Sequence, residues 1–238
     1  MLTDMNLVDA HHDAGPDFRH VDAWIFDLDN TLYPSSCDLF AQIDARMTAF
    51  VQELMGVGKD EARALQKAYY RDHGTTLSGL MRLHGVPADD FLTYVHDVDF
   101  SVLSPDPRLR SAIARLPGRR FIFTNGCRNY AGRVLDCLRL EGLFDDIWDI
   151  RTIAYRPKPD PESYRAVLAG AAVAPKRAVM FEDIARNLVP AHELGLTTVL
   201  LKNGSVWSKQ GPENPVPQSH HIHHETDDLA DFLHSLRI

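Results

Sequence analysis

The chain has 238 residues, of which 45% are apolar and 24% charged, and its formal net charge is −8 at pH 7. These values are typical of a globular protein with one large domain, or of a core with a smaller insert. The negative charge argues against a general nucleic-acid binder, because such a protein needs a basic face. We therefore expect no nucleic-acid polymer as a partner.

The cysteines and the N-terminal residues indicate the compartment. Three cysteines, an odd and sparse count, give no disulfide framework, so we expect a cytoplasmic protein. Residues 1–20 are polar and lack the basic start and apolar middle of a signal peptide, and we predict that they form a flexible tail. No apolar run is long enough to cross a bilayer, so no membrane partner is expected.

The first predicted element is a short buried strand over residues 23–26. The following stretch, 34–103, is predicted to be all-helical, with Asp38 as the cap of its first helix. Its helices are expected over 39–54, 59–72, 77–83 and 88–97. We predict that this stretch is a helical cap domain, inserted into a core made of residues 21–33 and 104–238.

Strands and helices alternate in the second half of the chain. Strands are expected over 119–123, 146–150, 176–181 and 197–201, and helices over 107–116, 129–140, 161–171 and 184–194. This alternation predicts an α/β fold with a doubly wound, parallel, Rossmann-like sheet. Residues 203–219 are expected to form a loop, Ile222 to belong to an edge strand, and Thr226 to cap a last helix.

Asp27 and Asp29 follow the first predicted strand, with Leu28 between them. In extended backbone the two carboxylates point to one side and the leucine to the other. Such a pair is costly to bury unless a cation lies beside it. Ligands of open α/β sheets bind beyond the carboxyl ends of the strands, so we interpret the pair as part of a site. An ordinary turn is the alternative.

Three further polar groups fall at the same predicted edge of the sheet. The sequence TNG at 124–126 offers donors to an anion at a strand-to-helix turn. The pair Glu182 and Asp183 suits a hard cation with oxygen ligands. Lys158, between two prolines, carries a positive charge that would neutralise a phosphate. Taken singly, each has an ordinary alternative, namely a turn, a helix cap and a solvent-exposed lysine.

In combination, these motifs resemble a known superfamily. The ordered set DLDNT at 27–31, TNG at 124–126, Lys158 and ED at 182–183 is similar to the four motifs of the haloacid dehalogenase superfamily. Further segments resemble its pyrimidine 5'-nucleotidase-like family, namely LYP at 32–34, YYRDHGTTLSGLM at 69–81, VHD at 95–97, PDPRLR at 105–110 and FEDIARNL at 181–188.

The resemblance implies a Mg²⁺-dependent phosphomonoesterase. Asp27 would attack phosphorus and form an aspartyl-phosphate, and Asp29 would act first as general acid and then as general base. Lys158 would neutralise the nucleophile and the phosphate together. The remaining roles are phosphate binding by Thr124 and the backbone amide of Asn125, and Mg²⁺ binding by Asp27, the backbone carbonyl of Asp29, Asp183 and, directly or from behind these ligands, Glu182.

The family also implies a small phosphorylated metabolite as the partner, with a nucleoside 5'-monophosphate, UMP or CMP, as the expected substrate. A sugar phosphate or pyridoxal phosphate on the same site is the alternative. The acid at Asp29 argues against dehalogenation, since dehalogenases of the superfamily lack it. A phospho-receiver or a non-catalytic binding protein is less favoured, because a long helical insertion follows the first strand. We expect a monomer or a homodimer.

Four histidines near the C-terminus suggest a metal site, because imidazole is a common metal ligand. Adjacent histidines on a strand point to opposite faces, so no single ligand set follows from the spacing. We therefore favour surface strand residues for this group, which consists of His220, His221, His223 and His224.

Overall fold

The computed structural model describes residues 15–202, 204 and 220–238. Within these residues the strands form one parallel six-stranded sheet. The strands are β1 (Ala23–Phe26), β2 (Arg119–Phe123), β3 (Asp146–Trp148), β4 (Ala178–Glu182), β5 (Thr197–Leu201) and β6 (His224–Thr226). Their order is β3-β2-β1-β4-β5-β6, so β1 lies in the middle, between β2 and β4. The prediction of a doubly wound parallel sheet is confirmed.

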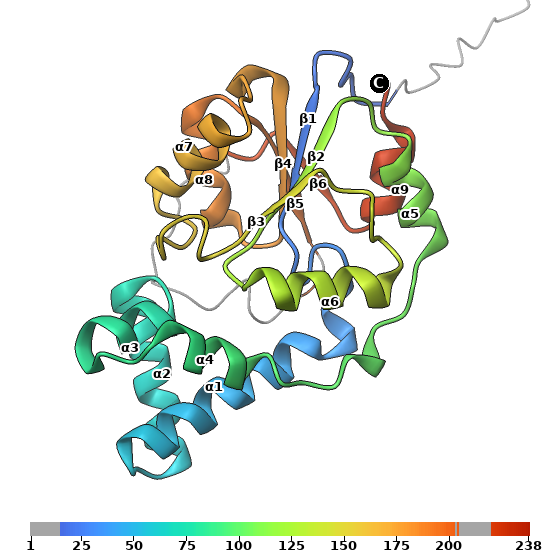
Figure 1. Cartoon of the computed structure of the whole chain (residues 1–238). Helices are drawn as coiled ribbons and strands as arrows, with labels where there is room; N and C mark the ends of the chain where they lie inside the picture. The colour runs from blue at the N-terminus through green and yellow to red at the C-terminus, as the bar shows by residue number, and fades with distance from the viewer. Residues whose placement is uncertain (1–14, 203, 205–219) are drawn as a thin grey trace, which may run out of the picture.

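Helices cover both faces of this sheet. The α-helices are α1 (Leu39–Met55), α2 (Lys59–His73), α3 (Thr76–His84), α4 (Ala88–Val95), α5 (Pro107–Ala114), α6 (Arg128–Leu138), α7 (Pro161–Gly170), α8 (Leu188–Leu194) and α9 (Leu229–Ser235). Single 3-10 turns are η1 (Ser35–Cys37), η2 (Phe100–Val102), η3 (Pro175–Arg177) and η4 (Ala185–Asn187). Helices α7 and α8 lie on one face, and α5, α6 and α9 lie on the other (Figure 1).

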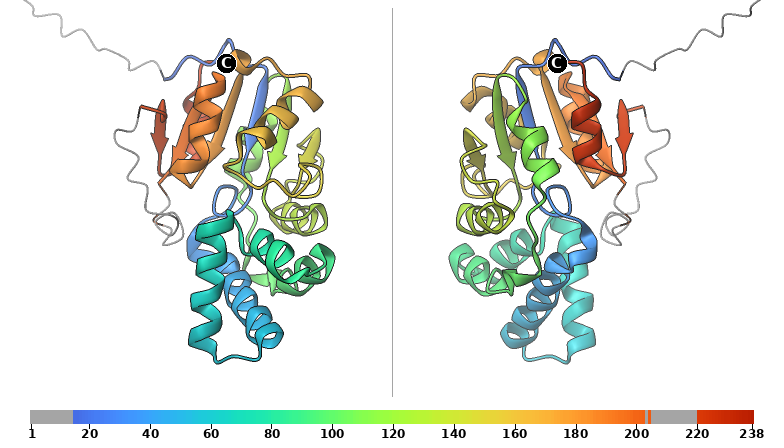
Figure 2. Two further views of the ribbon diagram at one scale, coloured as in Figure 1. Left: turned by 90° about the vertical axis from the view of Figure 1, so that its left-hand side faces the viewer. Right: turned by 90° about the vertical axis from the view of Figure 1, so that its right-hand side faces the viewer.

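The four helices α1 to α4 are inserted between β1 and β2 and lie beyond the carboxyl ends of the strands (Figures 1 and 2). Helix α1 buries Leu39, Ile43 and Val51, which recur at helical spacing, and ends at Gly56 with φ of 65°. The division of the chain into a core and a separate cap domain stays a prediction. The arrangement places these helices opposite the edge of the sheet at which ligands bind in α/β folds.

Strand β1 is buried along its whole length, as a parallel strand covered on both faces must be. The Trp24 indole Nε1 donates to the carbonyl oxygen of Pro117 at 2.7 Å, which satisfies the one polar atom of that side chain. The Phe26 ring stacks on Phe181 of the neighbouring β4, with ring centroids 4.6 Å apart. These contacts fix the end of β1, and with it the position of the residues that follow.

Several predictions of local structure are wrong. Asp38 precedes α1 with a left-handed backbone, φ of 61°, and its side chain makes no capping hydrogen bond. The cap of α9 is Asp228, whose Oδ1 accepts from the amide of Asp231 at 2.9 Å, because Thr226 still belongs to β6. Helix α8 begins at Leu188, since the preceding residues form the turn η4, and Ile222 lies outside β6.

Part of the predicted tail is packed against the body of the protein. Phe18 is 1% exposed, and its amide donates to the carbonyl oxygen of Arg237 at 2.9 Å. Residues 15–20 therefore do not form a loose tail, because an aromatic ring anchors them. The rest of that tail, residues 1–14, and the predicted loop, except residue 204, lie outside the described residues.

The C-terminal histidines do not all lie on an exposed strand. Only His224 belongs to β6. His221 is 2% exposed, and its Nε2 donates to the carbonyl oxygen of Ala185 at 3.1 Å, so the prediction of a surface strand residue is wrong there. None of the helices in the described ranges is long and apolar enough to cross a membrane.

Candidate active site

The carboxyl ends of the central strands bring the predicted site residues to one edge of the sheet. Asp27 directly follows β1, Thr124 follows β2, and Glu182 is the last residue of β4. The chain turns in opposite directions from β1 and from β4, so this is the switch point of the doubly wound sheet. The Asp27 amide donates to the Phe181 carbonyl oxygen at 2.9 Å, which extends the pairing of the strands into the site.

Lys158 joins two of these acids. Its Nζ lies 2.5 Å from Asp27 Oδ1 and 2.7 Å from Glu182 Oε2, and all three side chains are buried. The lysine comes from the loop before α7, so it reaches β1 from 131 residues away in the sequence. A buried ammonium needs such partners, because an unpaired charge in the interior is costly. Lys158 is therefore not the solvent-exposed lysine of the alternative interpretation.

Burial and neighbouring charges shift the pKa values of this group. Burial raises the pKa of Asp27 to about 7, the negative charge of Glu182 adds to the rise, and Lys158 opposes it. Burial acts to lower the pKa of Lys158, but the charges of Asp27 and Glu182 outweigh it, so that this pKa is raised. The lysine thus stays protonated, whereas burial and mutual repulsion make Asp27 hold its proton more tightly than a free carboxyl does, unless a further positive charge lies beside it.

The acidic residues form a set that fits a metal ion. Carboxylate oxygens of Asp27, Glu182 and Asp183 all lie within 4.8 Å of one another. Asp183 Oδ2 is buried and has no hydrogen-bond partner among the described residues, and burial raises the pKa of this carboxyl well above its usual value. A buried, unpartnered carboxylate oxygen is the donor that a hard cation such as Mg²⁺ takes. Glu182 has both oxygens engaged, by Lys158 and by the Ile184 amide.

Asp29 is held by two tyrosines that the sequence analysis missed. Tyr33 and Tyr130 donate their hydroxyls to Asp29 Oδ1, at 2.6 and 2.5 Å. Burial raises the pKa of Asp29, whereas these two hydrogen bonds act to lower it. Tyr33 stands four residues after Asp29 and could have been considered from the sequence. Tyr130 is 101 residues away, and no sequence signal links it to Asp29.

Hydrogen bonds within the loop after β2 hold Thr124 and Asn125 in place. Thr124 is fully buried, and its Oγ1 accepts from the Gly126 amide at 2.9 Å. The Asn125 side chain accepts from the Lys158 amide at 2.8 Å and donates to the Lys158 carbonyl oxygen at 3.2 Å. Asn125 therefore fixes the backbone that carries the lysine. Phosphate binding by Thr124 and by the Asn125 amide stays a prediction.

One cavity connects this acidic edge to the inserted helices. Asp27, Asp29, Lys158 and Asp183 line its end at the sheet. Its other end is lined from the inserted helices by mostly apolar side chains, with Lys67, Gln66 and Asp44 among them. A ligand bound to the acidic edge thus faces α1 to α4 with its other end.

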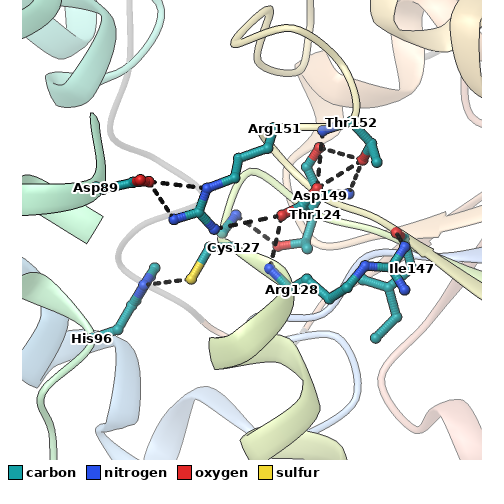
Figure 3. Close-up of polar contacts among 10 residues, drawn as sticks. Asp89, His96, Thr124, Cys127, Arg128, Ile147, Asp149, Arg151 and Thr152 are labelled. Carbon is teal, nitrogen blue, oxygen red and sulfur yellow. Dashed lines mark hydrogen bonds and ion pairs between the residues drawn. The ribbon is translucent and has the colours of Figure 1, made fainter. Parts of the chain in front are cut away.

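The inserted helices also contact the core beside this cavity, through α4 (Figure 3). Arg151 of the core pairs with Asp89 of α4 at 2.5 Å, and Cys127 Sγ lies 3.3 Å from His96 Nδ1, at the end of that helix. Burial lowers the pKa of His96 to about 4, so its ring is neutral near pH 7. This ring stacks on Tyr130, with centroids 4.2 Å apart and an interplanar angle of 11°.

A model of a protein family matches residues 21–195, well over half of the chain, and this family is described as haloacid dehalogenase-like hydrolase. The chain belongs to this family. The matched range contains β1 to β4 and every residue of the acidic edge described above. Membership of the haloacid dehalogenase-like hydrolases, inferred from the four sequence motifs, is thereby confirmed.

Two curated proteins are similar to the chain in sequence. Phosphate metabolism protein 8 of Saccharomyces cerevisiae is 29% identical over 199 residues, which are 74% of this chain and 60% of the yeast protein. The chain thus matches less than two thirds of that protein's length. Enolase-phosphatase E1 of Frankia alni is 42% identical over 60 residues, 25% of each protein.

Solved structures share the fold. CbbY from Rhodobacter sphaeroides in complex with phosphate has a TM-score of 0.60 and 19% identity, covering 89% of this chain and 96% of that one. The HAD phosphatase from Thermococcus onnurineus also has a TM-score of 0.60, with 18% identity, and the match covers 92% of this chain and 100% of that one. At these identities the likeness supports the fold of a haloacid dehalogenase-like hydrolase.

Proposed function

We propose that the chain is a Mg²⁺-dependent phosphomonoesterase that acts on small phosphoesters through an aspartyl-phosphate intermediate. The observation that carries the proposal is the bridge of Lys158 between Asp27 and Glu182, with the unpartnered Asp183 oxygen beside it. The similar proteins agree with this chemistry, since they include an enolase-phosphatase, a phosphatase and a protein in complex with phosphate.

In the proposed reaction Asp27 attacks phosphorus, and the ester bond to the leaving group breaks. Asp29 gives its proton to the leaving oxygen, and it later takes a proton from the water that hydrolyses the aspartyl-phosphate. Lys158 holds positive charge at Asp27 Oδ1 and so lowers the repulsion between the nucleophile and the phosphate. Asp27, Asp183 and the Asp29 carbonyl would hold Mg²⁺, which would supply charge stabilisation for the phosphoryl oxygens. Glu182 keeps Lys158 in place.

For the substrate, we propose a nucleoside 5'-monophosphate with a pyrimidine base, UMP or CMP. The inserted helices serve in this proposal as a cap that covers the leaving group and excludes water. The aromatic and aliphatic side chains at that end of the cavity suit a flat base better than a bare sugar. The partner is a small metabolite, and the expected location in the cytoplasm and the state of monomer or homodimer stay predictions.

The test is phosphate release by the purified protein from UMP, CMP, ribose 5-phosphate, pyridoxal phosphate and p-nitrophenyl phosphate, with Mg²⁺ and with EDTA. We expect Mg²⁺-dependent release, fastest from UMP or CMP. Faster turnover of ribose 5-phosphate or pyridoxal phosphate would show that the substrate belongs to that class and is not a nucleotide. Absence of release from all five would overturn the proposal and favour a binding or receiver role.

The hydrogen bonds to Asp29 give a prediction about pH. Tyr130→Phe removes one hydroxyl donor and keeps the ring that stacks on His96. That donor stabilises the charged carboxylate, so its loss raises the pKa of Asp29 further. In the profile of kcat against pH, we expect the limb that reports Asp29 to move to higher pH.

Tyr94→Phe is the matched control, because its hydroxyl donates to Glu53 at 2.6 Å on the outside of the inserted helices. Its pH profile should coincide with that of the unmodified protein. An unshifted limb in Tyr130→Phe, or an equal shift in the control, would contradict the role of Tyr130 in setting the protonation of Asp29.

A further inference from the structure

The end of the cavity that faces the leaving group is mostly carbon. Its apolar lining comes from three of the inserted helices, α1, α3 and α4, and consists of Phe40, Ile43, Met47, Leu77, Phe91, Leu92 and Val95. Such a surface binds the flat or apolar body of a ligand, and a few polar groups then decide which ligand is accepted. The question is which polar group in this half of the cavity is free to do so.

The polar groups of the inserted helices are already paired with one another. Asp44 Oδ1 accepts from Gln66 Nε2 and from Lys67 Nζ, both at 2.7 Å, and its Oδ2 accepts from Arg63 at 3.2 Å. Gln66 Oε1 in turn accepts from the Thr48 hydroxyl at 2.5 Å. This network fixes the side chains of α1 and α2 on each other and leaves their charges compensated.

Arg186 is different. It lies in η4, three residues after Asp183, and reaches from the core toward the inserted helices. Its guanidinium donates to the Tyr70 hydroxyl and lies over that ring, 4.6 Å from the centroid. In the part of the chain that the structure describes it forms no ion pair, and its Nε is buried without a hydrogen-bond partner. Burial lowers its pKa.

A guanidinium in this position would be stabilised by an oxygen acceptor. Arg186 is half-buried, and a partly desolvated cation without a counter-charge is less stable than a paired one. Arg presents a planar set of donors that matches carbonyl or phosphate oxygens. Arg186 lines the same cavity as Asp27, and its guanidinium lies against Tyr70 of α2, one of the inserted helices. An acceptor that satisfies it must therefore belong to the leaving group and not to the transferred phosphoryl group.

We propose that Arg186 is a specificity-determining residue that binds an oxygen acceptor on the leaving group, and that this acceptor is a carbonyl oxygen of a nucleobase lying between the apolar side chains. This inference rests on the proposed phosphomonoesterase function. The apolar surroundings favour a neutral carbonyl on a flat ring, and a second phosphate is the other source of the same oxygen chemistry. Tyr70 keeps the guanidinium turned toward the cavity before the ligand binds.

The test compares two substrates whose leaving groups both contain a flat ring, with carbonyl oxygens on that ring in only one of them. UMP has carbonyl oxygens on its ring, and phenyl phosphate has none. In Arg186→Met we expect kcat/KM for UMP to fall by roughly 10- to 100-fold, the range of a hydrogen bond to a charged group. The value for phenyl phosphate should change by less than about twofold, because its leaving group makes no such bond.

Arg82→Met serves as the matched control, since it makes the same chemical change on an exposed position of α3; we expect UMP turnover within about twofold of the original. An equal loss on UMP and phenyl phosphate in Arg186→Met would overturn the proposal, because Arg186 would then only hold the inserted helices to the core. Should that variant fail to fold, Arg186→Lys should still lose activity on UMP alone.

A sugar bisphosphate tests the other source of the acceptor. If the unmodified protein prefers a sugar bisphosphate to UMP and Arg186→Met loses that preference, the nucleobase part of the proposal is wrong. Failure of the proposed function itself looks different, because the unmodified protein would then release phosphate from none of these substrates.

Discussion

Asp27→Asn is expected to abolish phosphate release, with kcat lowered by about 10⁴-fold or more, the size of effect seen when a catalytic nucleophile is removed. The amide is a poor nucleophile at phosphorus and carries no charge to bind a cation. Asp27 is buried and contacts Lys158, so no other carboxylate can take over its position in the variant. Release of phosphate from UMP and from p-nitrophenyl phosphate, measured with Mg²⁺, checks this prediction.

Asp136→Asn is the matched control, because it makes the same chemical change on an exposed position of α6. It should leave the rate within about twofold, as expected for a surface substitution. Circular dichroism should show that Asp27→Asn keeps its fold, because Lys158 still has Glu182 as a partner. A folded Asp27→Asn protein with substantial turnover would show that Asp27 is not the nucleophile.

Removal of divalent metal is expected to have the second large effect. Three carboxylates converge within 4.8 Å, and one lysine cannot balance them. We expect EDTA to lower kcat by about 100-fold or more, since charge stabilisation by a metal contributes several kcal/mol. Mg²⁺ should also stabilise the fold by about 2.7 kcal/mol at one hundred times its Kd, which raises Tm by several degrees.

Asp183→Asn tests whether a bound metal causes these effects. It removes the negative charge of a carboxylate whose Oδ2 has no hydrogen-bond partner in the described ranges. Both the activation by Mg²⁺ and the rise of Tm with Mg²⁺ should shrink strongly in this variant, whereas Asp136→Asn should respond like the original protein. An undiminished rise of Tm with Mg²⁺ in Asp183→Asn would place the metal elsewhere.

The sheet and the residues at its edge could be predicted from the sequence, because both depend on short-range patterns. Apolar runs such as 23–26 mark buried parallel strands, and the acids follow where these strands end. The helix caps were harder to predict. Asp38 and Thr226 are good capping residues by type, but the left-handed backbone of Asp38 and the extension of β6 through Thr226 exclude the expected hydrogen bonds.

The supporting residues of the site could not be found from local patterns. Tyr130 reaches Asp29 only because α6 packs beside the loop after β1, and the Asn125 side chain binds the backbone of Lys158 across 33 residues. Such contacts depend on how helices pack against the sheet and not on spacing along the chain. The lack of an ion pair at Arg186 among the described residues is likewise a property of the folded cavity, since the sequence shows only another arginine.

The stack of His96 on Tyr130 connects the inserted helices to the side chain that holds Asp29. His96 follows α4 of the inserted helices, and the tyrosine under its ring is the one that donates to Asp29. Any outward swing of α4 has to separate these rings and uncover one face of the tyrosine. In the proposed mechanism, a displacement of α4 would therefore remove one of the packing contacts of the tyrosine that holds the general acid.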